Sequence, residues 1–324
     1  MDRNLALNLA RVTEAASLES AKYLGRGDKN IADQAAVDGM RAMLDTLNIN
    51  GVVVIGEGEM DEAPMLYIGE RIGKQNENSL EVDIAVDPVD GTSCVAKGLP
   101  NAVSVVAIAP RGHLLNAPDM YMDKIAVGPK AKGAIDLNES VKYNIINVAK
   151  ALNKNIEDLT VSMLDRERHE GIIKECRELG VRIKLFQEGD VAAAIATCFE
   201  ETGVDIMLGI GGAPEGVIAA AALKCLGGEF QGKLVAYEEE EIVRCKSMNV
   251  EVDKVMYMED LVKGNQVYFA ATGISDGELL RGITYGSNNT AKTHSVVMRA
   301  ETGTVRFIES IHRLDKKPCY TKNE

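Results

Sequence analysis

The chain has 324 residues, of which 46% are hydrophobic and 26% are charged, so it has the composition of a globular protein with one large core or two domains. Its net charge of −13 and its aromatic content of only 4% argue against a general affinity for nucleic acids or anionic membranes. No apolar stretch approaches the length of a membrane span, and charged residues interrupt the N-terminal segment where a signal peptide has its apolar core. We therefore expect a soluble, cytoplasmic protein without nucleic-acid or membrane partners.

The first half of the chain predicts two helices followed by strands. Apolar residues recur with helical spacing over residues 4–24 and 31–47, and Asp28 or Asn30 can cap the second helix. Apolar runs then predict strands at 52–55, 82–87, 103–109 and 123–127.

From about residue 138 the pattern changes to an alternation of strands and helices, which is typical of βαβ units with a parallel sheet. Strands are predicted at 159–164, 181–186, 204–209 and 229–236, and helices at 139–150, 166–179, 190–200, 214–226 and 238–247. Further strands are predicted at 267–271, 295–300 and 305–311, the last two joined as a hairpin. We place a domain boundary between residues 130 and 158.

The six cysteines form no C-x-x-C pair, and Cys176, Cys198 and Cys225 fall in segments with helical periodicity. A disulfide framework or a zinc site would show closer or more regular spacing. We therefore interpret the cysteines as buried thiols in a reducing compartment.

The most informative stretch is the run DPVDGT at residues 87–92, which follows the apolar strand 82–87. Pro88 is expected to end this strand, and Gly91 can adopt the positive φ of a tight turn. Asp87 and Asp90 would then face a common point beside the Thr92 hydroxyl. Because Mg²⁺ prefers carboxylate and phosphate oxygens, this pattern favours a metal site over a simple Asp-Pro turn.

More acids follow the neighbouring strand 52–55, namely Glu57, Glu59 and Asp61. Neighbouring strand ends share one edge of a sheet, where ligand sites of α/β proteins form. Carboxylates gathered there would repel one another unless cations lay between them, so we expect one or more divalent metals. For Asp33, spacing alone predicts no more than a favourable interaction with a helix dipole.

The run GIGGAPEG at residues 209–216 joins a strand to a helix in which Pro214 suits the first position. Free backbone N–H groups at such a turn attract phosphate, and a nucleotide-binding turn is an alternative interpretation. Glu215 is unexpected in a loop that binds only an anion, because its carboxylate would repel phosphate. A metal ion between the two would remove that conflict.

Two other clusters follow predicted strands in the second half. Arg166 and Arg168 stand beside His169 at a helix start, where cations are unfavourable unless an anion is near. Residues 188–190, Glu-Gly-Asp, are interpreted by themselves as an N-terminal cap, and the alternative is that they bind sugar hydroxyls.

Together these motifs resemble the lithium-sensitive, metal-dependent phosphomonoesterases, and most closely the class II fructose-1,6-bisphosphatases. The resemblance rests on seven segments that span nearly the whole chain: GRGDKN at 25–30 with Asp33, GEGEMDEAP at 56–64, DPVDGT at 87–92, KGLPN at 97–101, NAPDMYM at 116–122, GGAPEG at 211–216 and ATGISDG at 271–277. Four positions depart from the family pattern: Arg166 and Glu167, where relatives commonly have Lys and Pro in a Lys-Pro-Arg-His run; Glu188, where Asp is common; and the variable Ser93.

The resemblance implies a layered αβαβα sandwich of the α/β class, with a mixed sheet in the N-terminal half and a largely parallel sheet in the C-terminal half. Residues 1–150 would form a metal-binding phosphatase domain and residues 151–324 a sugar-phosphate-binding domain. The implied metal ligands are Asp33, Glu57, Asp87, Asp90 and Glu215, and the residues that prepare the attacking water are Asp61 and Thr92. The implied substrate contacts are Asp90, Gly91, Thr92, Tyr121, Arg166, Glu167, Arg168, Glu188, Gly189, Asp190 and Gly212.

The implied activity is metal-dependent hydrolysis of the 1-phosphate of D-fructose 1,6-bisphosphate, with Mg²⁺ or Mn²⁺, in gluconeogenesis. We also expect a homo-oligomer, either a dimer or a tetramer. The alternatives are a sedoheptulose-1,7-bisphosphatase or dual-specificity enzyme, an inositol-monophosphatase-like enzyme, and two non-phosphatase functions. These last two are a dinucleotide-binding module or dehydrogenase built on residues 204–226, and a non-catalytic protein with structural metal sites.

Overall fold

The structure is a computed structural model that describes residues 4–58, 63–248 and 250–317. These residues form helices and two β-sheets, so the predicted α/β class is confirmed. The chain divides into two compact units, unit 1 with Met1–Leu114 and Gln266–Glu324, and unit 2 with Leu115–Asn265. This division differs from the predicted one near residue 150, because the C-terminal strands return to the sheet of the N-terminal unit.

Unit 1 contains a sheet with the strand order β12-β13-β11-β4-β3-β1-β2, and β14 pairs with β13. Within this sheet, β1 and β3 are the only parallel neighbours among the described strands, and the other pairs are antiparallel. The sheet is therefore mixed, as predicted. The strands are β1 (Ile49–Ile55), β2 (Arg71–Ile72), β3 (Leu80–Asp90), β4 (Val103–Pro110), β11 (Tyr268–Gly273), β12 (Thr284–Gly286), β13 (Thr290–Arg299) and β14 (Thr304–Arg313). The predicted C-terminal hairpin is the β13–β14 pair.

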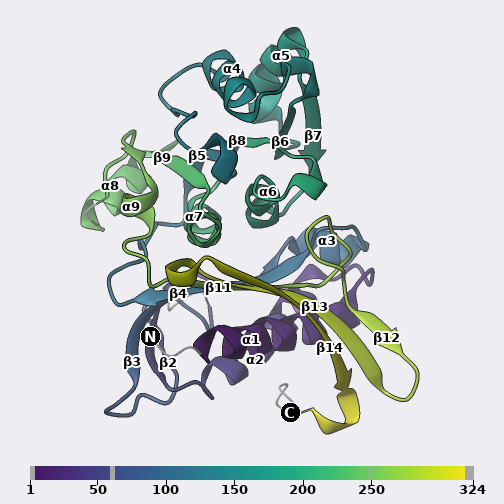
Figure 1. Ribbon diagram of the computed structural model, residues 1–324. Helices are drawn as coiled ribbons and strands as arrows, with labels where there is room; N and C mark the ends of the chain where they lie inside the picture. Colours follow the sequence, from purple (N-terminus) through teal and green to yellow (C-terminus); the bar gives the residue numbers. More distant parts are fainter. Residues whose placement is uncertain (1–3, 59–62, 249, 318–324) are drawn as a thin grey trace. The chain divides into compact units, whose positions relative to one another are not determined.

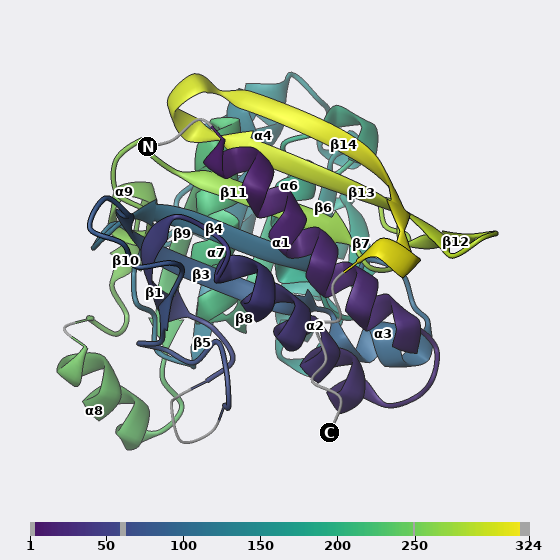
Figure 2. The same cartoon turned by 90° about the horizontal axis from the view of Figure 1, so that it is seen from below.

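Two helices, α1 (Leu5–Ser20) and α2 (Lys29–Leu44), lie side by side on one face of this sheet (Figure 2). The N-cap of α2 is Asp28, whose carboxylate accepts the backbone N–H groups of Asn30 and Ile31. Of the two caps that the sequence allowed, Asp28 is therefore the correct one. A short helix, α3 (Thr92–Lys97), follows β3.

Unit 2 contains a sheet with the strand order β10-β9-β5-β8-β6-β7. Its strands are β5 (Tyr121–Val127), β6 (Thr160–Leu164), β7 (Arg182–Phe186), β8 (Ile206–Gly212), β9 (Glu229–Val235) and β10 (Val255–Met256). The strands β6, β7 and β8 are parallel, whereas β5, β9 and β10 run antiparallel to their neighbours. The sheet is therefore mixed, and the prediction of a largely parallel sheet holds only for β6, β7 and β8, since β9, which was also part of the predicted alternation, runs antiparallel to β5.

The helices of unit 2 cover both faces of its sheet (Figure 1). α4 (Val141–Leu152) and α5 (Glu170–Leu179) lie on one face, while α6 (Asp190–Ala196) and α7 (Ala213–Leu226) lie on the other. Two more helices, α8 (Glu239–Ser247) and α9 (Met258–Leu261), follow β9 and β10.

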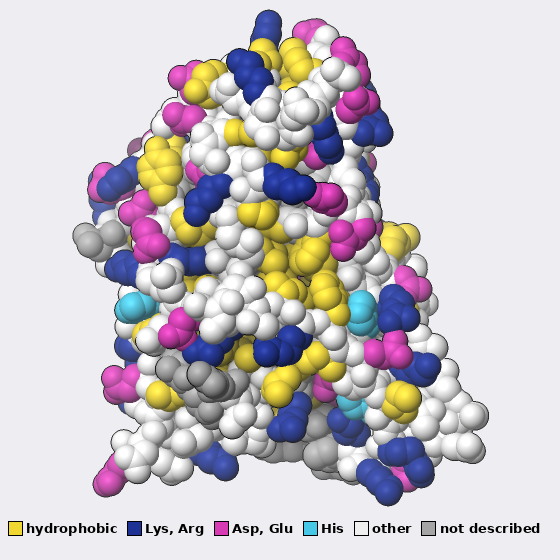
Figure 3. All heavy atoms as spheres, in the orientation of Figure 1, with side chains coloured by type: hydrophobic (Ala, Val, Ile, Leu, Met, Phe, Trp, Pro, Cys, Tyr) yellow, Lys and Arg dark blue, Asp and Glu magenta, His cyan; other side chains and the backbone are white. Residues whose placement is uncertain are grey.

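Among the described residues, no helix combines the length and the apolar character that a bilayer crossing requires. Acidic and basic side chains are interspersed over the face drawn in Figure 3. Neither sign forms a continuous band on the described part of that face.

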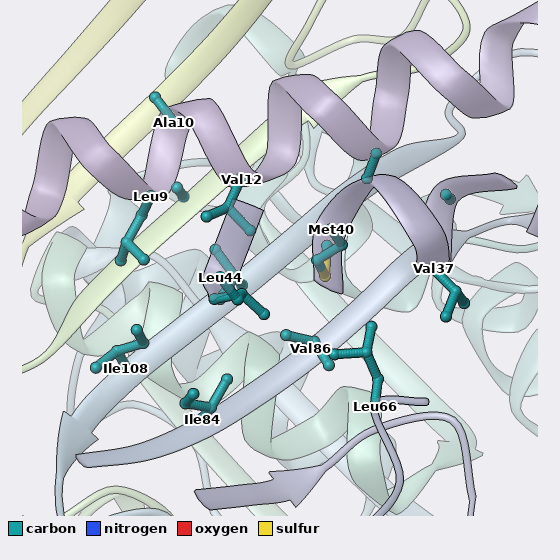
Figure 4. Packing of buried hydrophobic residues seen from close by; sticks show 14 of the residues in the cluster. Leu9, Ala10, Val12, Val37, Met40, Leu44, Leu66, Ile84, Val86 and Ile108 are labelled. Carbon is teal, nitrogen blue, oxygen red and sulfur yellow. The ribbon is translucent and has the colours of Figure 1, made fainter. Parts of the chain in front are cut away.

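The core of unit 1 forms where the apolar faces of α1 and α2 meet β3 and β4 (Figure 4). Leu44, near the end of α2, is fully buried in this cluster, close to Ile84 and Val86 of β3. The two helices therefore hold the strand whose C-terminal end carries the DPVDGT run.

We expect Leu44→Ala to lower the free energy of unfolding by about 2–5 kcal/mol, because it removes buried methyl groups and leaves a cavity. Chemical denaturation followed by circular dichroism measures this loss. Leu7→Ala on α1 is the matched control, since that leucine is 49% exposed and should cost far less. Equal losses for the two variants would contradict the packing described here.

Candidate active site

The predicted meeting of acidic strand ends in unit 1 has a structural basis in the parallel pair β1 and β3. Ile55, at the end of β1, lies opposite Ala85 of β3. Glu57 and Asp87 each follow these positions by two residues, so both come at the same edge of the sheet. Asp61 and Glu59 lie outside the described residues.

Strand β3 does not end at Pro88 as predicted but continues to Asp90. A β-bulge separates two registers with β4, in which Asp87 lies opposite Val105 and Asp90 opposite Val103. The bulge takes Pro88 out of the regular ladder, so its missing N–H group is tolerated. Because residues two apart on β4 share a face, the bulge places both aspartates on one face of the sheet.

The turn after β3 is formed as predicted. Gly91 has a φ of 105°, which few residues other than glycine adopt, and α3 begins at Thr92. The Asp87 carboxylate accepts the backbone N–H of Val89 at 3.0 Å, and this local bond orients the side chain. Asp90 is buried.

Asp33 interacts with Glu57, which spacing alone did not predict. Helix α2 begins at Lys29, so Asp33 lies beyond the first turn, and the dipole interpretation is wrong. Its carboxyl group shares a hydrogen bond with that of Glu57. Burial, and then the charge and hydrogen bond of Asp33, raise the pKa of Glu57 to about 8. Two carboxyl groups in contact are therefore held together by a proton, in a place where a cation could replace it.

In unit 2, the predicted substrate contacts lie at one edge of the sheet. Arg166, Glu167 and Arg168 follow β6, and residues 188–190 follow β7. Gly212 ends β8, and Tyr121 begins the antiparallel neighbour β5, directly opposite Gly212. All these positions therefore share the edge formed by the C-terminal ends of the three parallel strands.

Arg168 is held rigidly at this edge. Its Nε and Nη2 atoms donate to the carbonyl oxygen of Ile210 at 3.0 and 2.7 Å, and its guanidinium lies 4.8 Å from the ring centre of Tyr121. The ring of Tyr237 packs edge-on against Tyr121 at 5.7 Å. Arg166 donates instead to the backbone of Asp165 and Gln187. The two arginines therefore have different surroundings, and the side chain of Arg168 is the more firmly held because it contacts both a carbonyl oxygen and an aromatic ring.

The glycine run of unit 2 is part of a strand rather than a phosphate-binding turn. Gly211 and Gly212 pair with β5, and β8 leads directly into α7, with Pro214 in its first turn as predicted. The nucleotide-turn alternative is therefore not supported. Glu215 follows on α7, and its Oε2 atom is buried without a hydrogen-bond partner among the described residues. Such an oxygen suits a cation ligand.

The sequence matches the family model of bacterial, glpX-encoded fructose-1,6-bisphosphatases over residues 3–312. It is 49% identical to fructose-1,6-bisphosphatase 1 class 2 of Escherichia coli K12 over 98% of this chain and 97% of that protein. The same values hold for the class 2 enzyme of Shigella flexneri. This chain belongs to the glpX family of fructose-1,6-bisphosphatases. The predicted family, and with it a phosphoric monoester hydrolase, is confirmed.

Among solved structures, the chain is similar to the extragenic suppressor protein SuhB of Bartonella henselae, with a TM-score of 0.36 and 12% identity over 61% of this chain and 74% of that one. It is also similar to an IMPase of Thermotoga maritima, with a TM-score of 0.35 and 14% identity over 63% of this chain and 80% of that one.

The predicted metal ligands of this family member lie in three places: the Asp33–Glu57 pair, the Asp87–Asp90 strand end, and Glu215 on α7. Within the described ranges, no three His, Cys, Asp or Glu side chains are close enough to hold an ion as placed. The residues of each unit nevertheless fit a divalent cation by their chemistry. In unit 1 the carboxyl groups of Asp33 and Glu57 share a hydrogen bond, and in unit 2 the Oε2 atom of Glu215 has no hydrogen-bond partner among the described residues. Their gathering around a cation stays a prediction.

Two residues near the edge of the unit 2 sheet, Lys124 and Tyr237, were missed by sequence reasoning. Lys124 forms an ion pair with Asp190, and Tyr237 packs on Tyr121. His169 is buried, with Nδ1 2.7 Å from the Leu164 carbonyl and Nε2 accepting the Ile210 N–H, so it joins the ends of β6 and β8. A lysine inside the predicted strand 123–127 was the one available signal for these two, since Tyr237 stands in no motif. His169 had been noted beside Arg166 and Arg168, but its role in joining two strand ends had not been predicted.

The Asp33–Glu57 pair predicts a pH-dependent stability for the metal-free protein. The pKa of Glu57 is raised from 4.5 to about 8, so the folded state holds an extra proton between those values. The stabilisation is complete below the lower value and is lost as the pH rises through the upper one. In EDTA, we expect the melting temperature to fall across this window and a divalent cation to restore it at the upper end.

Glu57→Gln should flatten this pH profile, because an amide does not titrate. Differential scanning fluorimetry measures both profiles, with Glu81→Gln on the exposed side of β3 as the control. If the melting temperature of Glu57→Gln falls with rising pH as steeply as that of the wild type, the pH dependence comes from another titrating group.

Proposed function

We propose that the chain hydrolyses the 1-phosphate of D-fructose 1,6-bisphosphate to give fructose 6-phosphate and inorganic phosphate, with Mg²⁺ or Mn²⁺ as the cofactor. The observation that carries the proposal is the pair of carboxyl groups on Asp33 and Glu57, which are in contact, so that burial together with the charge and hydrogen bond of Asp33 raises the pKa of Glu57 to about 8. Membership of the fructose-1,6-bisphosphatase family over nearly the whole chain supports the substrate.

The residues that would hold the cation are Asp33, Glu57, Asp87, Asp90 and Glu215. A bound divalent cation neutralises charge on phosphoryl oxygens and lowers the pKa of water, which is the chemistry that phosphomonoester hydrolysis needs. The residues themselves supply anchored oxygens, because the bulge in β3 and the Val89 contact orient the strand-end aspartates.

The remaining residues would position the substrate and the water. The Thr92 hydroxyl, at the start of α3, and Asp61, which is outside the described residues, are proposed to orient the attacking water in line with the leaving oxygen. At the edge of the unit 2 sheet, Arg166 and Arg168 are proposed to bind the 6-phosphate. Tyr121, residues 188–190 and Gly212 would contact the sugar.

The test is release of inorganic phosphate from fructose 1,6-bisphosphate, sedoheptulose 1,7-bisphosphate and inositol 1-phosphate, each with Mg²⁺, Mn²⁺ or EDTA. We expect the highest kcat/KM for the fructose bisphosphate and no turnover in EDTA. Turnover that is unchanged in EDTA would contradict the metal-dependent mechanism. If kcat/KM is highest for inositol 1-phosphate, that compound rather than fructose 1,6-bisphosphate is the preferred substrate. The predicted dimer or tetramer is measured separately by sedimentation equilibrium.

A further inference from the structure

Lys124 is a lysine in the interior of unit 2. It lies on β5, between β8 and β9, and only 1% of its surface is exposed. Its Nζ atom is 2.6 Å from Oδ2 of Asp190, the first residue of α6, which is also buried. Burying two charges costs free energy that their attraction only partly offsets, so such a pair is weak evidence for a role in stability. Its ammonium group reaches Asp190, which lies at the edge described above, and this contact points to a role in the site.

The surrounding glycines leave room for this pair. A Cβ atom at Gly211 would lie 1.9 Å from Oδ2 of Asp190 and 3.0 Å from Nζ of Lys124. A Cβ atom at Gly212 would lie 2.0 Å from Oε2 of Glu215. Two consecutive glycines of the GIGGAPEG run are therefore needed so that these charged side chains can occupy their places.

Glu215 lies within the electrostatic reach of the pair. Gly216, the next residue of α7, lies against the lysine, because a Cβ atom there would be 3.5 Å from Cε of Lys124. Lys124 thus cancels the charge of Asp190 beside a glutamate that carries an unpartnered oxygen. Without the lysine, the buried carboxylate of Asp190 would lie near the partly buried Glu215 with no positive charge from Lys124 beside them.

We propose that Lys124 is a positioning residue that sets the divalent-cation affinity of the site around Glu215, by holding the Asp190 carboxylate and keeping it from acting as an additional cation ligand. This inference rests on the proposed function, in which Glu215 is a ligand of the cation. Without Lys124, the negative charge of the Asp190 carboxylate is added to that of Glu215, so the site attracts a divalent cation more strongly than in the wild type. The Asp190 side chain, no longer held by the lysine, also moves away from the position in which it is expected to contact the sugar. Removal of Lys124 therefore tightens cation binding and weakens substrate binding at the same time.

The test is a charge cycle with the wild type, Lys124→Met, Asp190→Asn and the double variant. Counting Lys124, Asp190 and Glu215, these four proteins carry −1, −2, 0 and −1. Isothermal titration calorimetry with Mn²⁺ or Mg²⁺ alone should give a Kd for Lys124→Met that is lower than that of the wild type by about tenfold, the size expected for one charge a few ångströms away. Asp190→Asn should raise the Kd, and the double variant should return close to the wild-type value. The KM for fructose 1,6-bisphosphate should rise in Lys124→Met.

A merely structural role predicts a different result, namely weaker cation binding in both single variants and a further loss in the double variant. That outcome, or an unchanged Kd in Lys124→Met, would overturn the inference. If Lys124→Met does not fold, the other three proteins still decide, because only the charge explanation makes the double variant bind the cation more tightly than Asp190→Asn. Phosphate release by the wild type reports on the proposed function separately. A wild type that releases phosphate while the Kd values fail the predicted order rejects the role of Lys124 alone.

Discussion

Asp87→Asn is expected to abolish phosphate release while leaving the protein folded. Asp87 lies on β3 at the edge of the sheet where Glu57 also lies, and its carboxylate is proposed to bind the cation directly. Loss of outer partners of metal ligands alone costs about 10–100-fold in affinity or activity. Replacing a direct carboxylate ligand with an amide should cost more, and should raise the Kd for the cation in the same proportion. Steady-state phosphate release and calorimetric cation binding measure the two effects.

Asp83 provides a matched control on the same strand. It is buried, its Oδ2 atom accepts the backbone N–H groups of His113 and Leu114 at 2.8 and 3.1 Å, and it pairs with Arg111. Asp83→Asn should therefore lower the free energy of unfolding by about 1–3 kcal/mol, because it weakens buried hydrogen bonds, and should leave the cation Kd unchanged. Opposite results, with activity lost in Asp83→Asn and kept in Asp87→Asn, would remove the strand end from the mechanism.

Local patterns predicted the elements well because the information for them lies within each segment. The helical spacing over residues 4–24 and 31–47 corresponds to α1 and α2, and the alternation after residue 138 corresponds to β6 through α7. Gly91 was predicted to have a positive φ, and it has one, since the requirement is set by its own backbone.

Pairings between distant segments were not predictable in the same way. Tyr268 of β11 lies opposite Ile108 of β4, although nothing in either segment identifies its partner. This return of the chain is the reason that residues after 265 belong to unit 1, and the pairing of β5 with β8 and β9 is the reason that unit 2 begins at residue 115 rather than near 150. The bulge in β3 was missed for a related reason. Pro88 by itself predicts the end of a strand, and only the register with β4 shows that the strand resumes.

The same distinction between local patterns and distant pairings applies to the residues of the candidate site. Acids and arginines that follow strands were predictable, because the ends of neighbouring parallel strands share an edge. The contacts that tune them were not, since Asp33 with Glu57, and Lys124 with Asp190, join residues far apart in sequence. The glycine run was correctly singled out in the sequence, but its glycines do not form the predicted phosphate-binding turn. Instead, they leave space for the side chains of Asp190 and Glu215.

Arg168→Ala should lower kcat/KM for fructose 1,6-bisphosphate through a raised KM. The two donations to Ile210 and the contact with Tyr121 fix the guanidinium before substrate arrives, so little conformational entropy is lost on binding a phosphate. A hydrogen bond to a charged group contributes about 1.5–3 kcal/mol, which corresponds to a change in KM of roughly 10- to 100-fold.

The decisive comparison uses fructose 1-phosphate, which keeps the reacting phosphate and lacks the other one. If Arg168 binds the 6-phosphate, Arg168→Ala should reduce kcat/KM for the bisphosphate and leave that for fructose 1-phosphate nearly unchanged. Arg168→Lys should fall between the wild type and the alanine variant, because an ammonium keeps the charge but cannot make both donations to Ile210 and stack on the Tyr121 ring. Equal losses for both substrates would move Arg168 from phosphate recognition to the support of the sheet edge, since its contacts with Ile210 and Tyr121 would then matter for either sugar.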